Sequence, residues 1–296
     1  MKKKIISLCL VIALALTAIG GATLAYFTDK DEVQNTFTVG KVDITLDEAK
    51  VDDNGEALTG EKADRVHENT YTPNMVPGHV FDKDPTIHVE KGSEESYIFL
   101  DVSVKPYKSL FWLMAADASA DTTTTGLETF TIFNEDGTLK DAFKNESNVF
   151  GTTKFIQYMA ANKTIYQAMI GKWIKGIKHT DWTLCDMFWN DNDDYLTIRF
   201  AYKGDKDGNE CTVKPTATAD TDIKFMDTFE MPASVTQKMI EDGKSVGKMQ
   251  NTFGGQLHLN FTAYAIQADG LDTLADAYQA MFNQAMGTNL SSYTTP

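Results

Sequence analysis

Apolar and polar residues alternate in four stretches of the chain, which is the pattern of strands that bury one face. In the last stretch, Leu257, Leu259 and Phe261 share one phase, and the residues between them are polar. Asp227 is an exception, because it stands where the alternation of its stretch expects an apolar residue. The four predicted strands are Tyr97–Val104, Tyr195–Tyr202, Ile223–Phe229 and Gln256–Ile266.

An earlier strand is predicted where the alternation changes phase. Phe37 and Val39 set one phase, and Val42 and Ile44 set the other, with the change at Gly40–Lys41. One extra residue at this point keeps both apolar sets on the same face of a sheet. The sequence therefore predicts a β-bulge there.

Helical spacing replaces the alternation in the middle and at the end of the chain. Large apolar residues recur every three or four positions over Thr152–Ile177. Ser234 and Gln237 have the spacing of a capping box, which predicts a short helix that ends at Gly243. A C-terminal helix is predicted after Gly270.

The first 25 residues have the order of a secretory signal peptide. Lys2–Lys4 form a basic start, Ile5–Ile19 are apolar, and small residues follow. Cleavage is predicted after Ala25, so that the mature chain begins at Tyr26. The alternative is an uncleaved membrane anchor, because the apolar stretch up to Phe27 is long enough to span a bilayer.

Strands on both sides of a helical region predict a mainly β fold class. We expect residues 26–296 to form a single antiparallel β-sandwich domain with a C-terminal helix. The domain carries a helical insertion at about residues 109–190.

The charge balance excludes nucleic acid as the main partner. The chain has 27 Lys+Arg against 42 Asp+Glu, a net charge of −15. The signal peptide contains three lysines and no acidic residue, so its removal makes the mature chain more acidic, at −18. Phosphate binding needs clustered basic residues, which this composition does not favour.

Two cysteines, Cys185 and Cys211, remain after signal cleavage. In an exported protein they either form a disulfide or stay as thiols.

The strongest sequence signatures of enzymes are absent. No His-Glu-x-x-His zinc motif, nucleophile elbow or phosphate-binding loop occurs, so no catalytic residue is assigned. The candidates for a zinc or calcium site are His79, His88, Asp82, Asp84, Asp191 and Asp193. The alternative is that these residues form solvated loops and strands without a metal.

Four tryptophans cluster in the predicted insertion: Trp112, Trp173, Trp182 and Trp189. Aromatic residues at helical spacing usually form core. The other interpretation is a glycan-binding face.

The processing region Gly20–Asp29 and the strand Asn35–Leu46 are the most specific of several segments that match a known family. They resemble the corresponding segments of the TasA/camelysin family of exported Gram-positive proteins. Met75–Gly78 with Lys83–Asp84 is similar to a turn and strand of the family, and Ala263–Gly270 is similar to a C-terminal strand. His79 departs from the family, which usually has an acidic residue after Pro-Gly.

The resemblance implies a secreted, jelly-roll-like β-sandwich. Signal peptides of this family are cut by the dedicated signal peptidase SipW, and its best-known members form fibres of the biofilm matrix. In those fibres the N-terminal strand of one subunit completes a sheet of the next. The resemblance thus implies self-association, other matrix proteins as partners, and membrane contact only before cleavage. The donor-strand candidates are Phe27, Phe37 and Val39.

Two other function classes remain open. Camelysin is described as a metal-dependent endopeptidase, which would require a metal cofactor, whereas a structural protein would need none. A surface adhesin is the third class, in which Trp112 or Trp182 would contact a glycan or host ligand.

Overall fold

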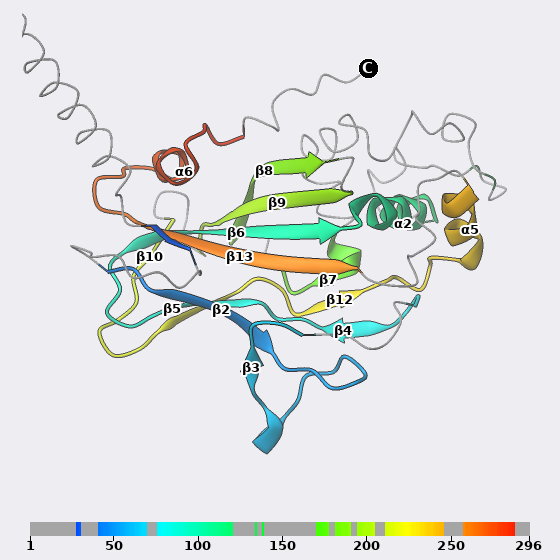
Figure 1. The fold of residues 1–296 in the computed structure, drawn as a ribbon, viewed down its shortest axis with the longest axis horizontal. Helices are drawn as coiled ribbons and strands as arrows, with labels where there is room; N and C mark the ends of the chain where they lie inside the picture. Colours follow the sequence, from blue (N-terminus) through cyan, green and yellow to red (C-terminus); the bar gives the residue numbers. More distant parts are fainter. Residues whose placement is uncertain are drawn as a thin grey trace, which may run out of the picture.

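The computed structural model describes residues 28–30, 41–69, 76–120, 134, 138, 170–177, 181–190, 194–204, 211–245 and 257–287. Its strands form three antiparallel sheets that pack as a sandwich (Figure 1). Among the residues described, no helix is long and apolar enough to cross a membrane.

The first sheet has the strand order β1-β13-β6-β9-β8, and the short β10 also pairs with β6. Its two longest strands, β6 and β13, pair along their whole length, from Lys105 opposite His258 to Ser96 opposite Gln267. The strands are β1 (Thr28–Lys30), β6 (Ser96–Lys105), β8 (Trp182–Asn190), β9 (Tyr195–Tyr202), β10 (Thr212–Val213) and β13 (His258–Gln267).

The opposite layer consists of two smaller sheets. The second sheet has the order β11-β5-β2-β3, and the third has the order β4-β12-β7. Their strands are β2 (Ile44–Ala49), β3 (Arg65–Val66), β4 (Val80–Asp82), β5 (Thr86–Val89), β7 (Ile174–Lys175), β11 (Thr221–Lys224) and β12 (Thr228–Glu230).

The main hydrophobic core fills the space between the layers. Leu100 and Val102 of β6 are buried there with Ile44 of β2 and Ile87 and Val89 of β5. These residues occupy alternate positions of their strands, so each strand turns one face toward this core. Burial of this apolar surface is the main favourable term in folding.

Helices α2 (Tyr107–Ala120), α5 (Gln237–Ser245) and α6 (Leu274–Phe282) complete the fold, with a single-turn 3₁₀ helix at Gly60–Lys62, and residues 170–173 are also helical. Helices α2 and α5 pack together at one end, and α6 covers the outer face of the first sheet (Figure 1). Ring centroids of Tyr278 and Phe282 on α6 lie 5.8 and 5.3 Å from that of Phe99 on β6. A second apolar cluster therefore lies beneath α6.

The predicted mainly β sandwich with a C-terminal helix is confirmed. Three of the four predicted strands correspond to β6, β9 and β13 within one or two residues at either end. The fourth, Ile223–Phe229, is wrong as one strand, because it divides into β11 and β12 in different sheets. Asp227, the exception in the alternation, lies between them. The predicted bulge includes Gly40, which lies outside the described residues.

Two helix boundaries are also corrected. The helical insertion does not reach residue 190, because Trp182–Asn190 is strand β8. Most of the predicted helical stretch, residues 152–169, lies outside the described residues. Helix α5 begins at Gln237 and continues through Gly243 to Ser245. Thr236 caps the first turn of the helix. Its Oγ1 accepts a hydrogen bond of 3.3 Å from the backbone N–H of Met239. Ser234 instead donates to the buried Asp117 of α2.

Candidate functional site

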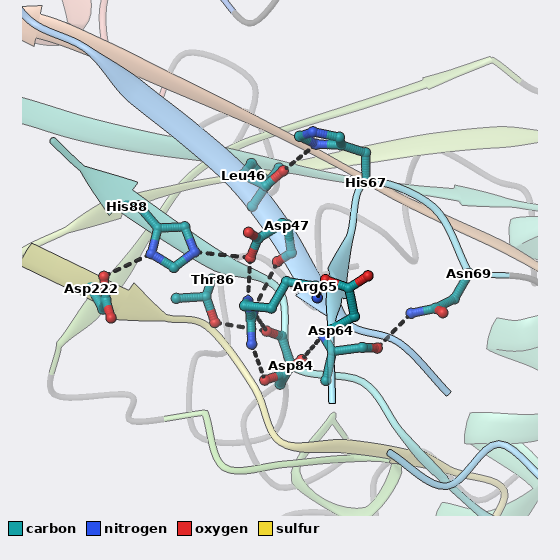
Figure 2. A network of polar contacts seen from close by, with 11 residues as sticks. Leu46, Asp47, Asp64, Arg65, His67, Asn69, Asp84, Thr86, His88 and Asp222 are labelled. Atoms are coloured by element: carbon teal, nitrogen blue, oxygen red, sulfur yellow. Dashed lines mark hydrogen bonds and ion pairs between the residues drawn. The ribbon is translucent and has the colours of Figure 1, made fainter. Parts of the chain in front are cut away.

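A row of alternating charges crosses the outer face of the second sheet (Figure 2). It consists of Asp222 on β11, His88 on β5, Asp47 on β2 and Arg65 on β3, and we call it the charged row. Each of the four strands of this sheet contributes one residue. His88 lies on the outer face because its neighbours Ile87 and Val89 face the core.

His88 is held between two carboxylates. Its Nδ1 lies 2.7 Å from Asp222 Oδ1, and its Nε2 lies 2.9 Å from Asp47 Oδ1. The strand register explains the first contact, because Asp222 and His88 are directly paired across β11 and β5. The second contact is diagonal, since His88 is paired with Thr45, two residues before Asp47. Both ring nitrogens are therefore engaged, and the imidazole joins three strands.

Arg65 extends the row to the sheet edge. Its Nε donates to Asp47, and its Nη1 donates to Asp84 Oδ2 at 3.0 Å. The carboxylate of Asp84 also accepts the backbone N–H of Ala49 at 2.6 Å. Asp84 thus connects the segment between β4 and β5 to β2 and β3.

These contacts raise the pKa of His88 and lower the pKa of Asp47. Burial disfavours the charged imidazolium, but hydrogen bonds to Asp47 and Asp222 and their negative charges outweigh it, so the pKa of His88 is raised. Burial alone would raise the pKa of Asp47, but hydrogen bonds from Arg65 and His88 and their positive charges lower it. Between these two pKa values, His88 and Asp47 both carry their charges.

Replacement of His88 by glutamine is expected to flatten the pH dependence of stability. A raised pKa in the folded state stabilises the protein below the unfolded value of 6.5, and this contribution disappears as the pH rises through the folded pKa. Because cross-strand charge pairs contribute about 0.2–1 kcal/mol each, we expect H88Q to cost about 1 kcal/mol at pH 5.5 and much less at pH 8.5. Urea unfolding at a series of pH values measures this.

The matched control is His258→Gln at the exposed first residue of β13. It should leave the pH profile unchanged. A profile for H88Q that parallels that of the wild type would contradict the role assigned to His88.

The predicted metal ligands do not converge into one site. His88 and Asp84 both belong to the network around the charged row. His79 contacts the carbonyl oxygen of Asn54 at 3.1 Å, and Asp82 accepts the backbone N–H of Ala57 at 2.8 Å. Asp191 and Asp193 lie outside the described residues. Within the described part of the chain, no group of three or more His, Cys, Asp or Glu side chains could hold a metal ion.

The tryptophans form core and not a binding face. Trp112, Trp173 and Trp182 are 0%, 1% and 4% exposed. The hypothesis that Trp112 or Trp182 contacts a glycan is therefore wrong for this fold. The side chain of Trp189 is outside the described part.

Cys185 and Cys211 are present as thiols and not as a disulfide. Both pack against the apolar cluster beneath α6.

A buried ion pair lies on the outer face of the first sheet. Arg199 on β9 binds Asp101 on β6 through two hydrogen bonds of 2.7 Å. Its guanidinium carbon lies 3.5 Å from the ring centroid of Phe282 on α6. Tyr264 on β13 donates to Asp101 at 3.2 Å, and burial together with the charge of Asp101 raises the pKa of Tyr264 to about 12. This network fastens α6 to the sheet.

The edge of the first sheet offers a second candidate site. Strand β1 pairs antiparallel with β13 at only three positions: Thr28 with Ile266, Asp29 with Ala265 and Lys30 with Tyr264. The described residues include no other strand on this side of β13. Six residues of β13, His258–Ala263, therefore pair with no described strand at this edge, and an unpaired strand edge is a template for another strand.

Sequence reasoning identified His88 and Asp84 but missed Asp47, Asp222 and Arg65. The sequence shows that these residues are polar positions within short strands, but it does not show which strands pair with one another.

Comparison with protein families supports the resemblance found in the sequence. The family model described as camelysin metallo-endopeptidase matches residues 1–68. This match covers the predicted signal peptide, β1, β2 and β3. Neither the curated proteins nor the solved structures contain a match to the chain.

Proposed function

We propose that this protein is a secreted structural protein of the cell surface or extracellular matrix, whose subunits assemble by donating their N-terminal strand. The observation that carries the proposal is the position of β1 at the edge of β13. Strand β1 begins two residues after Tyr26, the predicted first residue of the mature chain. The segment that signal cleavage would release is therefore the segment that adds to a sheet edge.

Strand addition suits this edge on physical grounds. Backbone N–H and C=O groups along His258–Ala263 can pair with an incoming strand, and alternate side chains of that strand can be buried. Leu259 and Phe261 are only partly buried at this edge and pack against the main core. An incoming strand would cover them and add apolar burial to the backbone hydrogen bonds.

Cleavage would control assembly in this proposal. Before cleavage the strand is continuous with an apolar segment in the membrane. The cleaved protein is released with a free N-terminus, and self-association is then the main interaction.

Removal of the donor segment should abolish polymer formation. We expect protein that begins at Tyr26 to form fibres visible by electron microscopy. Protein that begins at Lys41 should remain monomeric with the same circular dichroism spectrum. Because Phe37 and Val39 supply the apolar residues of the segment, the double variant Phe37→Asp, Val39→Asp of the protein that begins at Tyr26 should behave like the truncated form. Fibres formed by protein that begins at Lys41 would refute strand donation.

A metal-dependent endopeptidase is the second candidate, because the matching family model bears that description. Casein cleavage by the purified mature protein, with and without a chelator, tests it. Chelator-sensitive cleavage would establish the activity and would direct the search for ligands to the residues outside the described part.

A further inference from the structure

Helix α6 covers one end of the outer face of the first sheet, the end at which β6 begins, whereas the other end of β6 leads into α2 (Figure 1). At this second end, polar residues of three neighbouring strands form two adjacent rows. The strand register sets both rows, since Ser103 pairs with Asn260 and Thr197, and Lys105 pairs with His258. We call these residues the polar face: Ser103, Lys105, Tyr195, Thr197, His258 and Asn260.

The polar face is directed away from the main core. Val104, Leu196 and Leu259, which alternate with its residues along β6, β9 and β13, pack in that core. Tyr195 lies beside Lys105, because the next residues inward, Leu196 and Val104, are directly paired. Tyr195, Lys105 and His258 therefore stand side by side across three strands, and all three are exposed.

A cycle of three hydroxyl groups fixes Tyr195 in place. Its Oη donates to Ser103 Oγ at 2.8 Å, and Thr197 Oγ1 donates to Tyr195 Oη at 2.9 Å. The hydroxyl oxygens of Ser103 and Thr197 lie 3.0 Å apart, so a third hydrogen bond closes the cycle. Ser103 and Thr197 are buried, whereas Tyr195 is 37% exposed. The phenol ring is thus held at the surface in advance, which lowers the entropy cost of binding a ligand there.

The charge of the polar face differs from that of the whole chain. It contains a lysine and no acidic residue, although acidic residues outnumber basic ones by 42 to 27 in the chain. Lys105 makes no ion pair with any residue that the structure describes. Two carboxylates next to the face are engaged: Asp101 binds Arg199, and the buried Asp194 accepts the backbone N–H of Lys108 at 2.9 Å. The ammonium group of Lys105 is therefore available to an anionic ligand.

A sugar chain that carries carboxylates has the chemistry to match. Its carboxylate can accept a charge-assisted hydrogen bond from Lys105. The C–H groups of its ring can stack on the electron-rich face of Tyr195. Asn260 and His258 are exposed and provide donors and acceptors for sugar hydroxyls. Neighbouring strands lie about 4.8 Å apart, so the distance across β6 from β9 to β13 is about 10 Å, which accommodates about two sugar residues.

We propose that the polar face binds an acidic polysaccharide, with a carboxylate on Lys105 and a sugar ring on Tyr195. This role goes beyond strand donation and does not depend on it. Side chains stand perpendicular to a sheet, so the polar face stays accessible when another strand pairs with the edge of β13. Repulsion by the remaining acidic surface is screened beyond about 8 Å at physiological ionic strength, so the local charge decides binding.

Calorimetric titration of the protein that begins at Tyr26 with short alginate oligosaccharides tests the proposal. Every sugar of alginate carries a carboxylate, and neutral dextran oligosaccharides of the same length are the comparison. We expect alginate to bind about tenfold more tightly than dextran, because only alginate forms the charge-assisted contact. Equal affinities for the two sugars, or no binding of alginate, would overturn the proposal.

Substitutions at Asn260 test the local charge with opposite signs. Asn260→Asp places a like charge on the polar face and should weaken alginate binding about fivefold, whereas Asn260→Lys should strengthen it about threefold. The side chain is exposed, so both variants should unfold in urea at the wild-type midpoint. Alginate affinities that do not differ between the two folded variants would contradict binding at this face.

Substitutions at Lys105 and Tyr195 test the two main contacts. Lys105→Gln should weaken alginate binding about fivefold, and Tyr195→Ala should weaken it about tenfold. Tyr195→Phe keeps the ring but breaks the hydroxyl cycle, so its loss should lie between wild type and Tyr195→Ala. The matched control is Lys91→Gln, at an exposed lysine in the turn after β5, and it should leave the affinity unchanged. Equal losses for Lys105→Gln and Lys91→Gln would show that only overall charge matters and would overturn the site.

Discussion

Replacement of Asp101 by alanine is expected to lower the free energy of unfolding by about 3–5 kcal/mol, because it leaves a buried guanidinium without its carboxylate. The side chains of Asp101 and Arg199 are only 8% and 12% exposed. Asp101 outweighs the effect of burial and raises the pKa of Arg199, so the guanidinium stays charged. It cannot escape the penalty by losing its proton.

The loss should extend to α6. Arg199 stacks on Phe282, and the hydroxyl of Tyr264 would lose its acceptor on Asp101. Urea unfolding measures the total effect, and hydrogen exchange of the α6 amides locates it. We expect those amides to exchange earlier than the amides of β6 in the variant.

Two further variants distinguish the effect of breaking a buried ion pair from the effect of removing any charged side chain. Asp242→Ala removes the acid of the exposed pair Lys238–Asp242 on α5 and should cost no more than about 0.5 kcal/mol. The double variant Asp101→Leu, Arg199→Met should recover most of the stability, because well-packed apolar residues often replace a buried ion pair without loss. A loss below 1 kcal/mol for D101A would contradict the burial of this pair.

The long strands were predictable because each has one face in the main core. Alternation identified β6, β9 and β13, whose inner residues include Leu100, Ile198 and Ala263. Their outer faces contain enough polar residues, such as Asp101 and Thr262, to keep the period visible. The same rule failed at Ile223–Phe229, because strands of three and four residues are too short to show where one sheet ends.

The charged row could not be predicted, because its contacts depend on strand order. His88 is 41 residues from Asp47 and 134 residues from Asp222 in sequence. Nothing in the alternation shows that β5 lies between β2 and β11. Residue type alone suggested a metal site at His88, whereas the structure places it between Asp222 and Asp47, and Asp47 is itself paired with Arg65.

Glu48 shows a further limit of pattern reading. It continues the inward phase of Ile44 and Leu46, and a carboxylate there would ordinarily argue against a core strand. Lys83, 35 residues further on, binds its Oε2 at 2.7 Å, and both side chains are more than 90% buried. The ion pair with Lys83 therefore offsets the cost of burying the carboxylate of Glu48 at a position where the local pattern predicts an apolar residue.

Replacement of Trp112 by alanine is expected to cost about 3–5 kcal/mol of stability, as for other large-to-small changes in a core. The indole is fully buried on α2, and its Nε1 donates to the carbonyl oxygen of Met239 at 2.9 Å. The change removes the packing of the ring and the hydrogen bond that joins α2 to α5. Because Leu110, Leu113 and Met114 of α2 belong to the main core, we expect the loss in the global unfolding transition.

Two variants distinguish a core role from a ligand-binding role for this residue. Trp112→Phe keeps most of the apolar volume but loses the donor, so it should cost clearly less than W112A and still more than about 1 kcal/mol. Val76→Ala, at a residue that is 50% exposed, should change stability by no more than about 0.5 kcal/mol. If Trp112 instead served an adhesin, W112A would retain its stability and lose binding on a glycan array. Unfolding curves and array binding of the same preparations therefore separate the two roles. A buried indole predicts that W112A loses stability, whereas a ligand-binding indole predicts that it loses only glycan binding.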